Sequence, residues 1–298
     1  MKNVVDYVTD FESYLVNEKK SSKNTVESYM RDIFQFIQYC NINGVKHVTD
    51  INSDIILKYD DYSLFLGKSQ STVSRSAASL RCYFSYLLKK SIIPNNPMKN
   101  VKTVHSEKKL PEILTNDEIV TLLNQPDITE YKGCRDKAML ELLYATGIKV
   151  SELIDLKISD VNLQIGILHI SLSKIPRILP MYPEAVKILN LYVTKVRSVV
   201  VTNPDEDRLF TNMNGQPMTR QGFWKIIKKY AESAGIKKDI TPHTLRHSFA
   251  AHLLENGAQL SDIKEMLGHS DISSTQVYAQ LIKSKYATAY KRFHPMAR

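Results

Sequence analysis

The sequence predicts a mainly α-helical protein of two domains, an N-terminal helical bundle and a C-terminal domain of mixed α/β structure with a small β-hairpin or sheet. Three observations predict this fold class. The chain has 298 residues, about twice the usual length of one domain. Apolar residues recur at helical spacing along most of it. Polar and apolar residues alternate, as in paired strands, between residues 167 and 181.

The N-terminal domain is predicted to hold about four helices between residues 5 and 88 and no strand. Serine and asparagine residues precede the apolar runs, as expected at capped helix starts. Gly67 interrupts one helical stretch and Pro94 stops the last helix. The two clearest apolar stripes are Tyr29, Ile33, Phe36, Ile37 and Tyr39–Cys40, and Leu80, Tyr83, Phe84, Leu87 and Leu88. We place this domain at residues 1–105.

A charged linker, residues 106–112, leads to the second domain, which we place at residues 113–298. Thr115 and Glu118 have the spacing of a capping box at the start of a helix. Gly147 suits the left-handed C-cap of a later helix. The remaining predicted elements are helices at 135–146 and 151–156, the hairpin at 167–181, and helices at 184–201, 220–234, 242–256, 260–267 and from 274 onward.

The chain is basic throughout, with a formal net charge of +9 and a pI of about 9.2. Residues 1–105 carry 14 Lys and Arg against 10 Asp and Glu, and the remainder carries 26 against 21. This balance favours a polyanionic partner such as nucleic acid. A solvated surface with a high pI has the same composition, so charge alone leaves both interpretations open.

Cysteine usage and hydropathy exclude several classes of protein. The three scattered cysteines, Cys40, Cys82 and Cys134, fit neither a disulfide scaffold nor a cysteine zinc site and indicate a reducing compartment. The first residues carry carboxylates where a signal peptide needs an apolar run. No stretch reaches the roughly 18 apolar residues of a membrane span. We therefore expect a cytoplasmic protein with no membrane partner.

Four strings in the second domain carry the residues suited to chemistry: ATGIKVSEL (145–153), SLSKIPRILP (171–180), TPHTLRHSFAAHLL (241–254) and LGHSDISSTQVYA (267–279). His243 and His247 lie one helical turn apart and could ligate zinc. Thr244, however, stands where a metalloprotease needs glutamate, and no third ligand is evident, so we predict no metal site. Taken alone, Arg246 could be a surface ion-pair residue and Tyr278 a core aromatic residue.

The order and spacing of these strings are more specific than any single residue. His243 and Arg246 stand three residues apart on one helix face, a Gly-His pair follows, and Tyr278 comes nine residues after His269. Together HTLRH, LGHSD and STQVY resemble the tyrosine recombinases, the phage integrase family, and are most similar to the Xer site-specific recombinases. The resemblance covers essentially the whole chain. It implies a SAM-like DNA core-binding domain followed by a catalytic DNA breaking and rejoining domain.

The resemblance also implies a role for each motif residue. Tyr278 would attack a DNA phosphodiester and leave a 3′-phosphotyrosyl link and a free 5′-hydroxyl. A phenol with a pKa near 10 needs a base or a positive field, and His243 would be the base. The planar fork of Arg246 would hold two phosphate oxygens, and His269 would donate a further hydrogen bond to the phosphate. Glu152 would orient basic and histidine neighbours, unless it is an ordinary surface carboxylate.

Two positions depart from the family pattern, and both concern the phosphate. Lys149 stands where the family has the arginine of ATGxRVSEL, so a point charge replaces a bidentate fork. The loss could cost about 2–4 kcal/mol at the transition state. The hairpin turn lacks the family's glycine-flanked lysine and is about one residue short. Lys174 is our candidate general acid for the 5′ leaving oxygen; the alternative is an ordinary exposed lysine.

The scheme implies no metal ion, no cofactor and no ATP. The phosphotyrosine bond conserves the energy of the broken phosphodiester, and the sequence has no GxxxxGK[ST] string. The cationic groups expected around the phosphate are Lys149, Lys174, His243, Arg246 and His269.

Double-stranded DNA is the implied partner, bound by a homo- or hetero-tetramer on two DNA sites. A paralogous recombinase subunit and a DNA translocase are further implied partners, and the implied role is chromosome dimer resolution or mobile-element integration and excision. The stretch 279–293 forms an amphipathic pattern suited to docking on a neighbouring subunit. The candidate DNA contacts in the first domain are Lys23, Asn24, Arg75 and Arg81.

Two alternative functions keep the same fold. A family member weakened in cleavage, as Lys149 and the altered turn would suggest, could serve as a DNA-binding structural partner. A type IB topoisomerase-like enzyme would use the same covalent step without strand exchange. An active enzyme forms a covalent protein–DNA adduct, whereas a structural partner binds DNA without forming one. A topoisomerase-like enzyme would relax supercoiled plasmid that lacks any recombination site.

Overall fold

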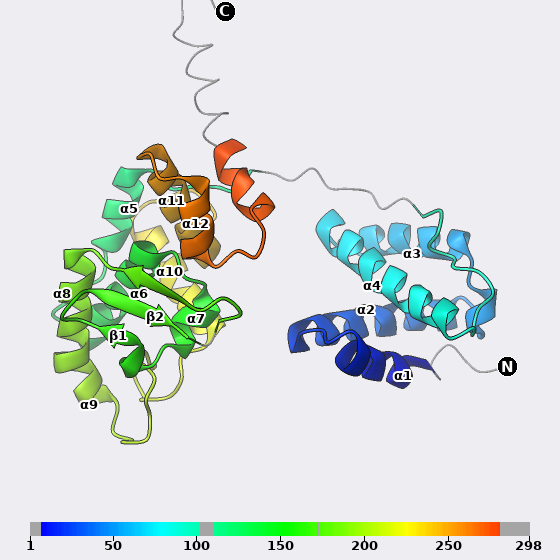
Figure 1. Ribbon diagram of the computed structural model, residues 1–298, viewed down its shortest axis with the longest axis horizontal. Helices are drawn as coiled ribbons and strands as arrows, with labels where there is room; N and C mark the ends of the chain where they lie inside the picture. Colours follow the sequence, from blue (N-terminus) through cyan, green and yellow to red (C-terminus); the bar gives the residue numbers. More distant parts are fainter. Residues whose placement is uncertain (1–6, 102–109, 172, 281–298) are drawn as a thin grey trace, which may run out of the picture. The chain divides into compact units, whose positions relative to one another are not determined.

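The computed structural model describes residues 7–101, 110–171 and 173–280. The backbone divides into two compact units, residues 1–108 and 109–298, each with its own hydrophobic core. As the sequence predicts, both units are mainly helical and the second contains a small sheet (Figure 1). The exact domain boundaries stay a prediction, because the expected linker lies partly in the first gap of the description. No helix in the described ranges combines the length and apolarity needed to cross a lipid bilayer.

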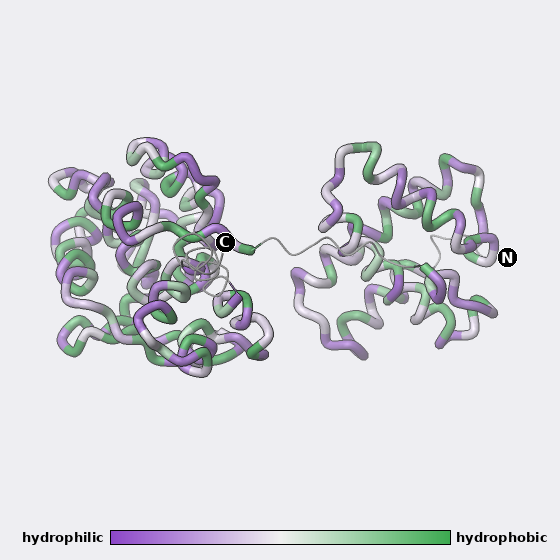
Figure 2. The backbone as a smooth tube through the Cα atoms, turned by 90° about the horizontal axis from the view of Figure 1, so that it is seen from above, coloured by the Kyte–Doolittle hydropathy of each residue, from purple (hydrophilic) through white to green (hydrophobic). Residues whose placement is uncertain are grey.

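The described part of the N-terminal unit is a helical bundle, as predicted. Its elements are α1 (Val8–Ser13), continued by π-helical Tyr14–Glu18, α2 (Lys23–Ile42), a 3₁₀ turn (Val48–Asp50), α3 (Ser53–Phe65) and α4 (Gln70–Lys89). Ser22, Asn52 and Ser69 each accept a hydrogen bond from a backbone N–H three residues on. Each such cap stabilises its helix by about 1 kcal/mol. Hydrophobic and hydrophilic residues alternate along these helices (Figure 2), and the apolar faces meet in the core.

In the C-terminal unit the other elements pack around the buried helix α6. Its described helices are α5 (Asn116–Leu123), α6 (Tyr131–Thr146), α7 (Val150–Asp155), a 3₁₀ turn (Ile158–Asp160), α8 (Pro183–Leu191) with π-helical Tyr192–Arg197 and α9 (Ser198–Val200), α10 (Arg220–Ser233), α11 (Pro242–Glu255) and α12 (Leu260–Leu267). Residues 273–280 are helical as well. The predicted capping box of Thr115 and Glu118 is confirmed at the start of α5. The helix predicted at 184–201 has a π-helical segment in its middle.

The sheet contains β1 (Val161–Asn162), β2 (Ile167–Ile170) and β3 (Arg177–Pro180) in antiparallel order β1-β2-β3. Leu168 lies opposite Leu179 and Ile170 opposite Arg177, so the predicted hairpin is confirmed. Strand β1 is not among the predicted elements, because two residues are too few to show an alternation.

The end of α6 determines how α11 approaches it. Gly147 has φ +59°, the left-handed conformation expected of a C-cap glycine. A Cβ on Gly147 would lie 2.3 Å from the ring of Phe249 on α11. Only glycine therefore allows both the left-handed turn and the close packing of α11 against it. This packing brings the carbonyl of Gly147 to α11.

Candidate active site

Arg246 lies at the centre of the candidate site, on the first turns of α11. Thr241 caps this helix by accepting from the N–H of Thr244 at 3.3 Å, and Pro242 occupies its first position. Arg246 is 4% exposed. Its Nη1 donates to Gly147 O and its Nη2 to Leu267 O, both at 2.6 Å. The guanidinium is thus fixed between the C-terminal ends of α6 and α12, where helix carbonyls favour a cation.

The position of Arg246 has two consequences for binding. Burial lowers its pKa to about 10, so it remains a cation at neutral pH. The carbonyl bonds fix the plane of the guanidinium and leave further N–H groups on it for a ligand. A planar cation with several N–H donors can bind more than one oxygen of a phosphate.

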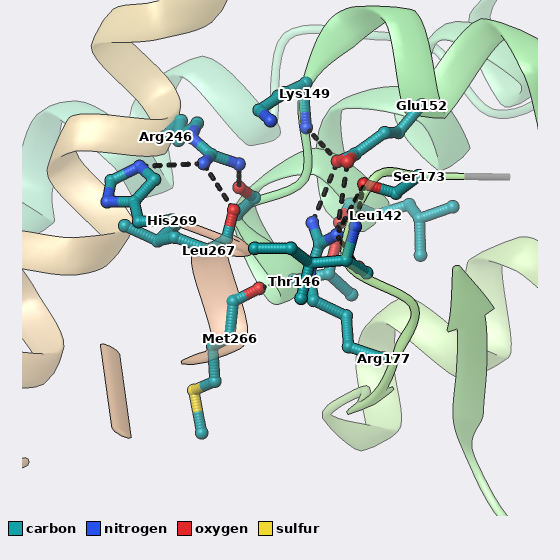
Figure 3. Close-up of polar contacts among 12 residues, drawn as sticks. Leu142, Thr146, Lys149, Glu152, Ser173, Arg177, Arg246, Met266, Leu267 and His269 are labelled. Atoms are coloured by element: carbon teal, nitrogen blue, oxygen red, sulfur yellow. Dashed lines mark hydrogen bonds and ion pairs between the residues drawn. The ribbon is translucent and has the colours of Figure 1, made fainter. Parts of the chain in front are cut away.

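His269 follows α12 and contacts Arg246 directly (Figure 3). Its Nε2 lies 3.1 Å from Arg246 Nη2, and its Nδ1 lies 3.0 Å from Oγ1 of the fully buried Thr275. A guanidinium can only donate, so Nε2 accepts and the ring proton sits on Nδ1, which donates to Thr275. Burial, together with the charges of Arg246 and Lys149, lowers the pKa of His269 to about 4. The ring is therefore neutral in this arrangement.

Tyr278 is 1% exposed and lies in the helical residues 273–280. Its hydroxyl is 2.8 Å from Nδ1 of His247, and the two share a hydrogen bond. Burial raises the pKa of Tyr278, and the charge of Arg246 opposes that shift. Burial, followed by the neighbouring His243 and Arg246, lowers the pKa of His247 to about 4. A neutral imidazole is thus in contact with the phenol.

His243, which the sequence resemblance selects as the base, is exposed one turn before His247 on α11. Its ring centroid is 6.3 Å from that of His247. Sequence reasoning considered His247 only as a metal ligand, and the spacing offered no signal for which ring the tyrosine meets. Within the described ranges no group of three or more His, Cys, Asp and Glu side chains is arranged to hold a metal ion.

Glu152 and Arg177 form a buried ion pair beside Arg246, with side chains 10% and 4% exposed. Arg177 donates to both carboxylate oxygens, at 2.8 and 3.1 Å, and the backbone N–H of Lys149 donates to Oε2 at 2.8 Å. Burial disfavours the charged carboxylate, but these hydrogen bonds and the Arg177 charge lower the pKa of Glu152 below its ordinary value. The basic neighbour of Glu152 is therefore Arg177, which sequence reasoning missed.

The two departures from the family pattern lie in the same region. Lys149 is half-buried, and burial lowers its pKa, aided by the charges of Arg246, Arg177 and Lys174 and opposed by Glu152. Lys149 thus belongs to the cationic cluster around Arg246. Lys174 is exposed in the β2–β3 turn, near enough for its charge to act on Lys149.

The candidate DNA contacts of the N-terminal unit have different surroundings. Lys23 and Asn24 are exposed at the start of α2. Arg75 is also exposed, but its Nη1 forms an ion pair with the buried Asp32 at 2.7 Å. Arg81 donates to Val101 O at 3.4 Å. Their part in DNA binding stays a prediction, and the docking segment expected at 279–293 lies almost wholly outside the described residues.

Comparison with known proteins places this site in a family. The family model "Phage integrase family" matches residues 112–285, and the model "Phage integrase, N-terminal SAM-like domain" matches residues 8–91. A tyrosine recombinase XerD of Staphylococcus epidermidis is 40% identical over 291 residues, which cover 97% of this chain and 99% of the relative. A tyrosine recombinase XerD of Listeria monocytogenes is 42% identical over 299 residues, covering 98% and 99%.

A solved structure, XerH site-specific recombinase bound to a palindromic difH substrate, superposes with a TM-score of 0.76 at 22% identity. It covers 95% of this chain and 84% of the other, and shows the shared fold. The chain therefore belongs to the phage integrase family, the tyrosine recombinases. Within that family it is a Xer-like site-specific recombinase, as the motifs predicted.

Proposed function

We propose that this recombinase cuts and rejoins double-stranded DNA through a 3′-phosphotyrosyl intermediate formed on Tyr278. The observation that carries the proposal is the buried, geometrically fixed Arg246, with His269 on one side and with its charge acting on the Tyr278 phenol. In the forward step the Tyr278 oxygen bonds to phosphorus, the bond from phosphorus to the 5′ oxygen breaks, and that oxygen takes a proton. Attack by a 5′-hydroxyl of another strand reverses the step and reseals DNA.

Activation of the phenol requires removal of its proton. His247 Nδ1 is already hydrogen-bonded to the hydroxyl, so its position suits it to accept that proton. Its lowered pKa opposes the transfer, and the charge of Arg246, which stabilises the phenolate, favours it. We retain His243 as the base that the family resemblance implies. Exposed on the same helix, it is suited to act after the phenol has left its buried position. The pair therefore offers a base in both positions of the tyrosine.

The phosphate would lie on the open edge of Arg246. Lys149 adds a second cation, and His269 would donate to the phosphate through Nε2 once the ring gains a proton on that nitrogen. Glu152 holds the Lys149 segment through its backbone N–H. Lys174 is the proposed general acid, because it is the exposed lysine of the turn beside Lys149.

The cationic cluster supplies the charge stabilisation that the pentavalent phosphate needs. We therefore propose that the reaction requires neither a metal ion nor ATP, since the phosphotyrosine bond retains the energy of the phosphodiester. Tyr278 must also become accessible, because a phenol on a residue only 1% exposed cannot meet the phosphate of a duplex. A shift of residues 273–280 upon DNA binding would expose it.

The proposed assembly follows from the chemistry. Each strand cut consumes one tyrosine, and exchange between two duplexes requires four cuts, so four protomers are needed. We further propose that a paralogous recombinase subunit can supply two of the four and that a DNA translocase can activate the complex. Native mass spectrometry of the DNA complex tests the first idea, and stimulation of recombination by an added motor with ATP tests the second.

The weakened-enzyme alternative is not favoured, because relatives that match nearly the whole chain are recombinases and Lys149 stays within the cationic cluster. The test uses a DNA duplex that the protein selects from a random library, with a nick placed so that the cleaved fragment diffuses away. A covalent adduct on a denaturing gel, absent from Tyr278→Phe while DNA affinity is retained, is expected. DNA binding without any adduct would refute the proposal.

A further inference from the structure

Arg177 is the first residue of β3, and its buried guanidinium joins segments that are far apart in the sequence (Figure 3). Its side chain contacts the start of α7, the end of α12 and its own hairpin turn. Each of these segments carries residues of the proposed cleavage reaction. The contacts are therefore suited to set the relative positions of several functional groups at once.

The contact with α7 runs through Glu152. Both carboxylate oxygens accept from Arg177, at 3.1 and 2.8 Å, and Oε2 also accepts the backbone N–H of Lys149 at 2.8 Å. The carboxylate is thus held from two sides, and through it Arg177 fixes the backbone that carries the Lys149 ammonium. Without Arg177, a buried carboxylate would lose its charged partner and would turn toward another donor or water.

The contact with α12 is the shortest. Arg177 Nε donates to Met266 O at 2.6 Å, and the next carbonyl, Leu267 O, accepts from Arg246. Gly268 then turns the chain at φ +62°, and a Cβ on it would lie 2.8 Å from Arg177 Nη1. The two arginines therefore hold consecutive carbonyls just before His269, and the bare glycine leaves space for Arg177.

The contact with the hairpin turn involves the residues on both sides of Lys174. Arg177 Nη1 lies 3.5 Å from Ser173 Oγ and 3.4 Å from Ile175 O. These hydrogen bonds are long, but they restrict a turn whose lysine is otherwise exposed to solvent. A general acid on such a turn needs this restriction, because proton transfer requires hydrogen-bond distance to the leaving oxygen.

A buried ion pair of this kind contributes little to stability compared with apolar side chains of similar volume. Geometry is therefore the better explanation of Arg177 than folding energy. We propose that Arg177 is a positioning residue for DNA cleavage, which aligns Lys174, and through Glu152 the Lys149 segment, with the phosphate held by Arg246. The inference rests on the proposed cleavage function and deepens it.

The test compares two substrates in single-turnover cleavage by the full chain. One is the selected, nicked duplex, and the other carries sulfur in place of the 5′ bridging oxygen at the scissile phosphate. A thiolate leaves without a proton, so the sulfur substrate bypasses the general acid. We expect Arg177→Gln to slow cleavage of the oxygen substrate by about 10- to 100-fold, the range typical of residues that orient functional groups. With the sulfur substrate the defect should shrink at least about fivefold, as it should for Lys174→Ala.

Three further proteins complete the design. Arg177→Lys keeps the charge but loses the fork, and it should stay impaired on the oxygen substrate. The double variant Glu152→Gln with Arg177→Gln removes both charges, so no buried carboxylate is left unpaired, and it should fold and show the same sulfur-dependent recovery. Ile178→Thr, at a 60% exposed position in the same strand, is the matched control and should cleave both substrates at the wild-type rate.

The outcomes test the positioning role of Arg177 separately from the proposed cleavage function. Wild-type rates for Arg177→Gln and the double variant, or equal defects on both substrates, would overturn the positioning role while the wild-type adduct still forms. No adduct with the wild-type protein on either substrate would instead overturn the proposed function, and the inference with it.

Discussion

Replacing Thr275 by valine should slow DNA cleavage, because the Thr275 hydroxyl holds the ring of His269 in place. Thr275 is fully buried, and its Oγ1 accepts the Nδ1–H of His269 at 3.0 Å. The other ring nitrogen accepts from Arg246, so both nitrogens of the imidazole are engaged. Valine has nearly the shape of threonine but offers no acceptor.

The magnitude follows from that loss. A buried N–H without a partner costs about 1–3 kcal/mol. If the cost falls on the orientation of His269 in the transition state, the cleavage rate drops by roughly 5- to 150-fold, at about 1.4 kcal/mol for each factor of ten. DNA affinity should change little, because the N–H groups of Arg246 left for the phosphate are untouched.

Single-turnover cleavage of the nicked duplex measures the effect, and Thr275→Ser is the matched control. Serine keeps the acceptor and loses one buried methyl group, about 0.8 kcal/mol of stability, so it should unfold at a lower temperature and yet cleave almost normally. Wild-type cleavage by Thr275→Val, or an equal defect in both variants, would refute the reasoning.

Three further predictions concern charge. Lys149→Arg should raise the cleavage rate by up to roughly a hundredfold if the pocket accepts a fork, since one more bidentate contact contributes about 2–3 kcal/mol; a sharp drop in rate would mean that the site is built around lysine. His247 and His269 have folded pKa values of about 4 against an ordinary 6.5, so the unfolded chain binds more protons between these values and stability is lost as the pH falls. Urea unfolding should show a loss on the order of 2 kcal/mol for each of the two histidines from pH 7 to 5. The variants His247→Gln and His269→Gln should each reduce that pH dependence of stability, and an unchanged pH dependence would contradict this assignment. Filter binding should show the logarithm of DNA affinity falling linearly with the logarithm of salt concentration, by about 0.9 per phosphate contacted, and a salt-independent affinity would contradict the electrostatic account.

The parts of the fold that sequence predicts well are those set by local chemistry. The capping box of Thr115 and Glu118 and the left-handed Gly147 depend only on neighbouring residues, and each appears as predicted. The β2–β3 hairpin is predictable because alternation over several residues indicates strands with one buried and one more exposed face. Strand β1 is too short to show such an alternation, and the π-helical segment inside 184–201 interrupts the α-helix for only six residues.

The site shows the same division. Motif spacing selected Arg246 and His269, and the structure joins them by a hydrogen bond. Motif spacing could not indicate which histidine of α11 contacts the phenol, because His243 and His247 share one helix face. The choice depends on where residues 273–280 pack. Arg177 was missed because its partner Glu152 lies 25 residues away, and only the tertiary fold brings β3 against α7 and α12.

The central claim is that the Tyr278 phenol becomes bonded to a DNA phosphate. Its most direct test is to trap the protein on the nicked duplex, digest the adduct with protease and nuclease, and locate the remaining nucleotide by tandem mass spectrometry. The account predicts a nucleotide joined through its 3′-phosphate to the peptide that contains Tyr278. A nucleotide on any other residue, or a link through a 5′-phosphate, would contradict it.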